Sequence, residues 1–432
     1  MTDPAPTETP PVPVAGAKRK AAIGFIYATA LMDVISLGIM IPVLPNLVKS
    51  LNGGDTALAA DWQVVFATVW AIMQFFFSPI LGMLSDRFGR RPVLLISIFG
   101  LGVDYLFMAF APTLSWLLVG RALNGITAAS FSTSGAYIAD ITPPEKRAAA
   151  FGLLGSAFGV GFVIGPGIGG FLGEIDLRLP FLVAAGLALA NWLYGLLILP
   201  ESLPPERRVP KFDWKKANPI GSLKLLSSHP DLLGLAGVFF LFQLAHNVLP
   251  SVFVLYTGFR YGWSPSDVGL MLMATGVANI VVQAGMVGRL VKAMGERGAL
   301  LLGLACGALG FLIYGLAPTA HVYWLGLPVF ALSGLIGAAG QGLMSRRVKP
   351  WEQGQLQGAN SSMMGLASLV GPSLFGLTFA WSVRHDATLH MPGLAILIAS
   401  ALLLLGFILA WKVAKAPDAA DNAMIAPEKA AP

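Results

Sequence analysis

Charged residues are scarce in this chain of 432 residues: Asp, Glu, Lys and Arg together make up 12% of it, about half the share of an average soluble domain. Cys306 is the only cysteine, so no disulfide can form within the chain. No Gly-Lys dipeptide occurs, which excludes a P-loop and an ATP-driven pump. The sequence also has no HExxH, no GxSxG and no Cys/His metal set. We therefore expect neither an enzyme nor a resident cofactor or metal.

Hydrophobic residues, by contrast, make up 56% of the chain, and the mean hydropathy is +0.72. Water would not tolerate so much apolar surface, whereas a lipid bilayer would. The net charge of +6 and the pI near 9.4 would suit nucleic acid, but the basic residues lie in short gaps between apolar runs. That arrangement is typical of the orientation signal of a membrane protein. We expect the bilayer as a partner and no nucleic acid.

Twelve apolar runs are long enough to cross a bilayer, which about 20 helical residues span. They lie at about 22–48, 61–84, 93–111, 114–139, 148–173, 179–199, 231–256, 265–290, 298–317, 321–345, 355–381 and 390–413. Basic residues precede the first run, as in a signal peptide, but that run is too long and contains Asp33, so we interpret it as a membrane helix. The fold class is therefore all-α, an integral membrane protein with twelve transmembrane helices.

The runs group into two bundles of six, at 21–199 and 231–413. The charged segment 200–230 between them is the expected linker, and the segments 1–20 and 414–432 are expected to be tails, the first of them disordered. If the N-terminus is cytoplasmic, 23 of the 28 Lys and Arg residues lie in cytoplasmic segments and 4 lie on the opposite side. This asymmetry predicts that both termini and the linker are cytoplasmic.

The two halves repeat each other. GMLSDRFGRR at 82–91 follows the second run, and GRLVKAMGER at 288–297 follows the eighth, 206 residues later. Gly165-Pro166 in the fifth run recurs at the same offset as Gly371-Pro372 in the eleventh. Such a duplication is typical of transporters whose substrate site lies between pseudo-symmetric halves, and it disfavours a channel.

Two acids and one arginine lie inside the predicted membrane helices: Asp33, Asp104 and Arg121. An ionisable side chain at the bilayer centre costs roughly 2.5–3.5 kcal/mol on insertion scales, so it normally faces a wet cavity or the bundle interior. Arg121 cannot be neutralised and needs a partner. We predict that these residues couple protons to substrate. The alternative for each aspartate is a protonated acid bonded to a neighbouring helix.

Two glycine-rich segments suggest moving parts. In the fifth run the residues at four-residue spacing form a stripe without side chains, which serves either tight packing or a surface that slides. We expect a motif there made of Gly161, Gly165, Pro166 and Gly169. The loop after the second run combines an acid, basic residues and two glycines, which favours a conformational latch over mere orientation charges. Its predicted gating residues are Gly82, Ser85, Asp86, Arg87, Gly89, Arg90 and Arg91.

Uncharged polar residues lie within the membrane helices of the second half. Gln243 and Asn247 are four residues apart, as are Asn279 and Gln283, so each pair shares a helix face. Together with Gln341 they are candidates for binding a large amphipathic substrate. Ordinary hydrogen bonds between helices explain them nearly as well.

Taken together, these segments resemble the tetracycline/proton antiporters of the major facilitator superfamily. LMDVISLGIMIPVLP, GMLSDRFGRRPVLL, GRALNGIT and GVGFVIGPGIGG are similar to family motifs of the first helix, loop 2–3, helix 4 and helix 5. The resemblance implies export of a metal–tetracycline chelate in exchange for protons, across a bacterial inner membrane. The divalent metal would then be part of the substrate. It also implies that Asp33 and Asp104 handle substrate and protons and that Ser85-Asp86 act in gating.

One departure from the family pattern concerns the ninth run, where drug-exporting members carry an acidic residue. Here it reads LLGLACGALGFLIYGLAP, without a carboxylate near Cys306 and Gly307. We therefore keep an alternative beside the tetracycline exporter: a proton-coupled transporter of another drug or metabolite.

Overall fold

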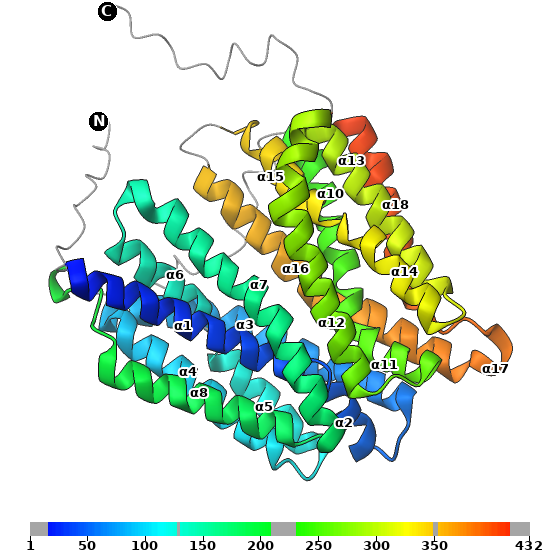
Figure 1. The fold of residues 1–432 in the computed structure, drawn as a ribbon, viewed down its shortest axis with the longest axis horizontal. Coiled ribbons are helices and arrows are strands. Elements are labelled where there is room, and N and C mark those ends of the chain that lie inside the picture. The colour runs from blue at the N-terminus through cyan, green and yellow to red at the C-terminus, as the bar shows by residue number, and fades with distance from the viewer. Residues whose placement is uncertain (1–15, 128–129, 209–229, 349–352, 415–432) are drawn as a thin grey trace, which may run out of the picture. The chain divides into compact units, whose positions relative to one another are not determined.

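A computed structural model describes residues 16–127, 130–208, 230–348 and 353–414, and every extended regular element in these ranges is a helix (Figure 1). Helices are expected here because a membrane span must satisfy its own backbone hydrogen bonds. Most of the expected N-terminal tail, most of the linker 200–230 and the C-terminal tail lie outside the described residues. The first helix begins at Gly16, within the expected tail, since its Ala, Lys and Arg residues favour helix.

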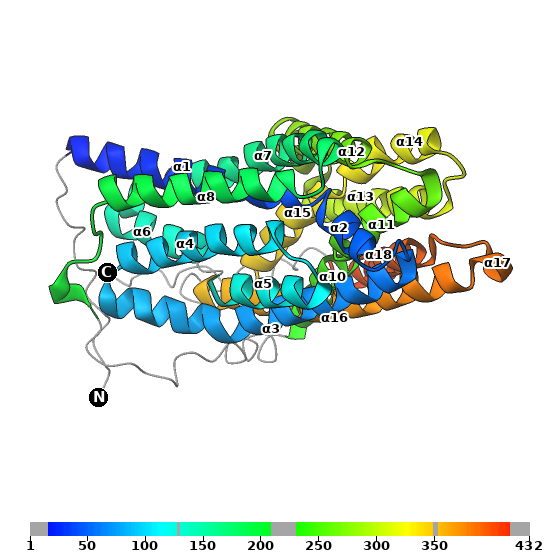
Figure 2. The same cartoon turned by 90° about the horizontal axis from the view of Figure 1, so that it is seen from below.

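The chain forms two compact units, described here one at a time. Unit 1 comprises residues 1–44 and 72–217. Its elements are α1 (Gly16–Met40), the later part of α3 (Thr56–Phe88), α4 (Arg90–Ala109), α5 (Leu114–Thr127), α6 (Ser130–Ile141), α7 (Pro144–Ile175), α8 (Leu179–Ile198) and the short η1 (Pro205–Arg207). Within this unit α1 packs along α7 and α8, and α4 packs on α8 and α5 (Figures 1 and 2). Phe25, Ile98 and Tyr137 are among its fully buried core residues.

Unit 2 comprises residues 45–71 and 218–432. Its elements are α2 (Leu44–Leu51), the first part of α3, α10 (Pro230–His246), α11 (Val248–Tyr261), α12 (Pro265–Ile280), η4 (Val281–Met286), α13 (Val287–Leu316), α14 (Ala320–Ala331), α15 (Gly334–Ser345), α16 (Gln353–Arg384), α17 (Asp386–Leu389) and α18 (Leu394–Val413). In this unit α13 packs on α18, α14 and α15, while α10 packs on α18 and α16.

The boundary between the units differs from the expected bundle limits, because residues 45–71 group with unit 2. Within unit 2, two contacts join α3 to α16. Gly376 leaves room for Val64, and Arg384 forms an ion pair with Asp61. Sequence periodicity cannot predict either contact. The sequence analysis therefore assigned the whole second run to the first bundle.

Ten segments of the described chain are long and apolar enough to cross a membrane. The segment Pro265–Leu316 joins two expected spans, and Gly295 breaks its helical geometry with φ 73° and ψ 169°. The expected span 114–139 is divided into α5 and α6, each too short alone, on either side of residues outside the description. If Pro265–Leu316 is counted as two spans and α5 and α6 together as one more, the segments match the twelve predicted spans.

The internal repeat extends to the element boundaries. α1 ends at Met40 and α10 ends at His246, while α5 begins at Leu114 and α14 at Ala320, each pair 206 residues apart. Gly89 and Gly295, also 206 apart, both have positive φ. The two units therefore share a backbone plan that includes a glycine turn at the same place.

Candidate functional site

The three predicted ionisable residues lie close enough to Tyr105 in unit 1 to act on it electrostatically. Asn124 Nδ2 donates a hydrogen bond of 2.8 Å to Asp104 Oδ2. Arg121 on α5 is in electrostatic contact with Asp104 on α4, and Asp33 on α1 acts on the same Tyr105 hydroxyl as these two residues. Tyr105 is 1% exposed and Asp104 is fully buried. The spacing in sequence hides this cluster, but the packing of α1, α4 and α5 assembles it.

Asp104 is equipped to exchange a proton. Within the described part of the chain its second oxygen, Oδ1, is buried and has no hydrogen-bond partner. A buried carboxylate with an open acceptor position is unstable as an anion unless a cation lies close by. Arg121 supplies that cation, and its Nη1 also lies 3.9 Å from Met40 Sδ at the end of α1. A carboxyl group in this setting can hold a proton or, beside Arg121, release it.

The helix-5 motif packs against α1, which carries Asp33. A Cβ added at Gly161 would lie 2.8 Å from Val34, and one added at Gly165 would lie 2.7 Å from the carbonyl oxygen of Ile35. Gly169 approaches the backbone of α1 at Ile39 in the same way, and Pro166 lies within α7 beside Gly38. The stripe therefore brings α7 into backbone contact with the acid-bearing helix. This geometry is that of a close helix pair.

The loop between α3 and α4 forms an ion-pair network centred on Arg90. Its Nη1 donates to Ser85 Oγ at 3.0 Å and pairs with Asp86 at 2.5 Å, while its Nε donates to Asp140 Oδ2 at 3.0 Å. The guanidinium is 13% exposed, against 45% for the Asp86 carboxylate. Arg90 thus ties the end of α3 to the end of α6. Sequence reasoning did not identify Asp140 as a partner of Arg90.

Glu201, just after α8, is a second residue that sequence reasoning missed. Its carboxylate accepts backbone hydrogen bonds from Arg90 (2.8 Å) and Arg91 (3.2 Å) at the start of α4, and from Ser202 and Leu203 (both 3.0 Å). It therefore caps α4, although it follows α8 in the sequence. The sequence feature that could have identified Glu201 is an acidic residue directly after an apolar span in a protein with a basic loop between its second and third spans.

The remaining loop residues have separate places. Gly89 has φ 108°, and a side chain there would collide with the Glu201 carboxylate. Arg91 Nη2 donates to the carbonyl oxygen of Leu196 at 2.8 Å. Arg87 is exposed and lies over the Phe88 ring, while Gly82 has open space around its Cα. The structure thus brings Ser85, Asp86, Gly89, Arg90 and Arg91 together, whereas Arg87 and Gly82 lie apart from the network.

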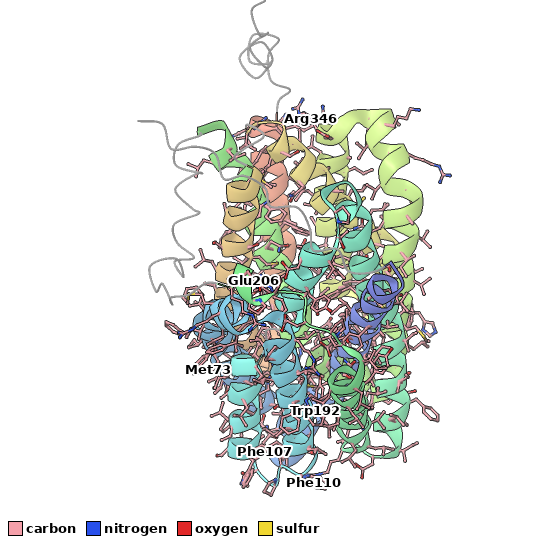
Figure 3. All side chains as sticks on the ribbon, turned by 90° about the vertical axis from the view of Figure 1, so that its left-hand side faces the viewer. Met73, Phe107, Phe110, Trp192, Glu206 and Arg346 are labelled. Atoms are coloured by element: carbon pink, nitrogen blue, oxygen red, sulfur yellow. The ribbon has the colours of Figure 1, made fainter. Side chains whose placement is uncertain are left out.

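Unit 2 contains a charge-inverted copy of this network. The positions of Arg90 and Asp140 recur 206 residues later as Glu296 and Arg346, which pair at 2.9 Å. Arg346 lies just beyond α15 (Figure 3). Arg297, at the position equivalent to Arg91, donates to the carbonyl oxygen of Trp411 on α18 at 3.0 Å. Sequence comparison revealed the repeated glycines but not the inverted pair.

The predicted polar residues of the second half do not form one cluster. Asn247 Nδ2 donates to the carbonyl oxygen of Gln243, which holds the break between α10 and α11. Asn360 Nδ2 donates to Gln341 Oε1 at 3.2 Å. Asn279 and Gln283 are exposed, and Gln283 lies in the π-helical turn η4 and donates to the carbonyl oxygen of Gly334 at 3.3 Å. Because η4 changes the helical period, four-residue spacing is a poor guide there.

Apolar side chains define the opposite end of unit 1. The rings of Phe107 and Trp116 pack in a tilted arrangement with centroids 4.6 Å apart, and Phe110 projects outward after α4 (Figure 3). Farther along α4, the rings of Phe99 and Trp192 are also tilted, with centroids 5.0 Å apart. Arg178 closes this end by donating to the carbonyl oxygens of Ala109 and Ala111 at 2.7 and 2.9 Å. Over the described residues, no group of three or more His, Cys, Asp or Glu could hold a metal ion.

Comparison with known proteins agrees with this architecture. A family model described as Major Facilitator Superfamily matches residues 26–342. The class C tetracycline resistance protein of Escherichia coli is 39% identical over 90% of this chain and 96% of its own length, and the class B protein of E. coli is 35% identical over 88% and 94%. The solved human organic anion transporter MFSD10 matches with a TM-score of 0.65 at 23% identity, over 91% of this chain and 99% of its own. The chain therefore belongs to the major facilitator superfamily and is a membrane transporter, not an enzyme.

Proposed function

We propose that this protein exports a tetracycline-like drug in exchange for protons by alternating access. The observation that carries this proposal is the Asp33–Asp104–Arg121 cluster around Tyr105 in unit 1. Exported cationic cargo and an entering proton would compete for the same carboxylates, so that binding one displaces the other. The relatives named as tetracycline resistance proteins support the drug class. A divalent metal would travel as part of the drug chelate, as substrate.

The membrane arrangement follows from the charge distribution. Both termini and the linker lie in the cytoplasm in this proposal, because Lys and Arg favour that side of a bacterial inner membrane. The Arg90 network, including Asp140 and Glu201, then sits at the cytoplasmic face, where it holds α3, α4 and α6 in one arrangement. Breaking and re-forming it would accompany each change of access.

Everted membrane vesicles test proton coupling directly. Vesicles acidified inside should accumulate tetracycline with Mg²⁺, and drug addition should release protons from the lumen. Asp104→Asn keeps the shape and removes the titratable charge, so it should abolish the coupled proton flux without lowering protein abundance. Asn124→Asp is unsuitable as a control because it adds a charge to the cluster, whereas Asp55→Asn, outside it, is a matched one. Accumulation that persists after an uncoupler collapses the gradient would show that the proton mechanism is wrong.

A second candidate is a proton-coupled exporter of other drugs. Two observations favour it: the ninth predicted span contains no carboxylate, and multidrug resistance protein 2 of Bacillus subtilis is 28% identical over 94% of this chain. Drug susceptibility of a pump-deficient host that expresses the chain separates the two. Resistance confined to tetracyclines supports the first proposal, and resistance to unrelated compounds without tetracycline supports the second.

A further inference from the structure

His246 occupies an unusual place in unit 2. It is the last residue of α10, directly before the break that precedes α11, and lies at the middle of the membrane-spanning segment Leu232–Tyr261. An ionisable residue at that depth is costly and is normally functional.

Three phenylalanines form a box around the imidazole. The ring centroid of His246 lies 4.5 Å from that of Phe242, 5.4 Å from that of Phe330 and 6.1 Å from that of Phe311. Phe311 and Phe330 come from α13 and α14 and are buried, as is Phe242. The box is therefore built by three separate helices of one unit.

The imidazole is poorly satisfied in this box. In the described structure Nδ1 is buried without a hydrogen-bond partner. Leaving such a group unpaired costs about 1–3 kcal/mol, which an apolar side chain of similar size would avoid. A histidine that served packing alone would normally be hydrogen-bonded. A histidine at this position therefore lowers stability relative to an apolar side chain, and a role in packing does not explain its presence.

The surroundings contain no counter-charge. No charged side chain of the described residues perturbs the ring electrostatically. Tyr314 on α13 packs against Phe330 of the box and stacks on Tyr323 of α14. The charged residues of α13 end at Arg297, and His321 lies in the first turn of α14. On the other helices that pack against α10, the charges Arg260, Arg384 and Lys412 lie in the last turns of α11, α16 and α18. Because a buried charge without a counter-ion is strongly disfavoured, the box favours the neutral imidazole.

The internal repeat gives the box a counterpart. Subtracting 206 from His246, Phe311 and Phe330 gives Met40, Tyr105 and Asn124. These are the residues that surround Asp104 and Arg121 in unit 1. The aromatic box thus stands in the second repeat where the first repeat has its ionisable cluster.

We propose that His246 is a second proton-binding residue of the transport cycle, which rests on the proposed proton-coupled export. The closed box holds the imidazole neutral. When movement at the α10–α11 break admits water, the ring takes a proton from the aqueous phase, since an exposed histidine is half-protonated near pH 6.5. Closing the box returns that proton to water. Protonation therefore favours the open arrangement and links it to pH.

Isotope-labelled imidazole NMR on the full chain in lipid tests the protonation step. The chain has five histidines, so Gln at His229, His321, His385 and His390 leaves His246 as the sole imidazole. We expect its resonance to titrate between pH 5 and 8 and the titration to shift when tetracycline with Mg²⁺ is added. A resonance that stays in the neutral form throughout, with and without drug, overturns the proposal.

Transport measurements supply the functional arm. His246→Gln should lose part of the drug-induced proton release and flatten the pH dependence of export, while His321→Gln, near the start of α14, should match the wild type. His246→Phe fills the box with an apolar ring and shows whether the fold tolerates loss of the imidazole. Coupled export by His246→Gln with unchanged proton release contradicts this inference alone. Wild-type export that survives an uncoupler contradicts the proposed function instead.

Discussion

A single methyl group at Gly89 should weaken the Arg90 network by two separable effects. Gly89 has φ 108° and ψ 159°, a region that only glycine adopts readily, so alanine there costs about 1–3 kcal/mol. The new Cβ would also displace the Glu201 carboxylate, which caps α4. Loss of a cap costs about 0.5–2 kcal/mol. We expect Gly89→Ala to lower the free energy of unfolding by about 1.5–5 kcal/mol.

Alanine substitutions at two other glycines allow the backbone cost and the cap cost to be measured separately. Gly295 has the same kind of backbone geometry but open space at its Cβ, so Gly295→Ala should show the backbone cost of about 1–3 kcal/mol alone. Gly82 is helical and also has open space, so Gly82→Ala should be neutral or stabilise by up to about 1 kcal/mol. The difference between Gly89→Ala and Gly295→Ala then measures the Glu201 cap.

Reversible unfolding of the purified variants in mixed detergent micelles gives these free energies, with transport rates measured in parallel. Glu201→Ala should reproduce the cap component and add little to Gly89→Ala, because both changes remove the same hydrogen bonds. Equal destabilisation by Gly89→Ala and Gly295→Ala, with full additivity of Glu201→Ala, would refute the idea that Glu201 caps α4.

Other substitutions test the remaining contacts. In Arg90→Lys, the lysine cannot contact all the partners of Arg90 at once, so one charge-assisted hydrogen bond of about 1.5 kcal/mol is lost. This loss should slow turnover about tenfold in vesicle transport, with little change in drug affinity in equilibrium binding. Gly165→Ala pushes α7 away from α1 and should lower the free energy of unfolding by about 1–3 kcal/mol, whereas the new methyl group of Gly155→Ala, on the same helix, has open space. Equal destabilisation by the two variants would contradict the packing argument. Asp61→Asn should destabilise by no more than about 1 kcal/mol and less in high salt, since the partner Arg384 is half-exposed, and exchanging the two charges should restore the loss.

The sequence predicted the membrane spans and the duplication because both depend on local patterns. Apolar runs mark the helices, and Gly89 and Gly295 mark a turn that recurs at a fixed offset. The pattern also identified Asp104 and Arg121, since an ionisable residue in an apolar run is conspicuous. It could not show that both of them, together with Asp33, meet at Tyr105.

The unpredicted features depend on contacts between distant segments. Glu201 is 111 residues from Arg90, and Asp140 is 50 residues from it, so no periodicity links them. The π-helical turn at Val281–Met286 leaves no mark in a hydrophobic run. Residues 45–71 likewise group with unit 2, where Val64 on α3 lies against Gly376 on α16, and no local pattern marks that grouping.

The charge inversion between the two repeats bears on how a duplicated chain avoids folding into the wrong pairs. Helices of similar length and hydrophobicity occur in both units, so during synthesis α4 could dock on the counterpart of α6 in the other repeat. Such a mispairing would place Arg90 against Arg346 or Asp140 against Glu296. Like charges in close contact cost free energy and disfavour the wrong partner. Because the charges at equivalent positions have opposite signs in the two repeats, each helix pairs favourably with its partner in the same repeat and unfavourably with the equivalent helix of the other repeat.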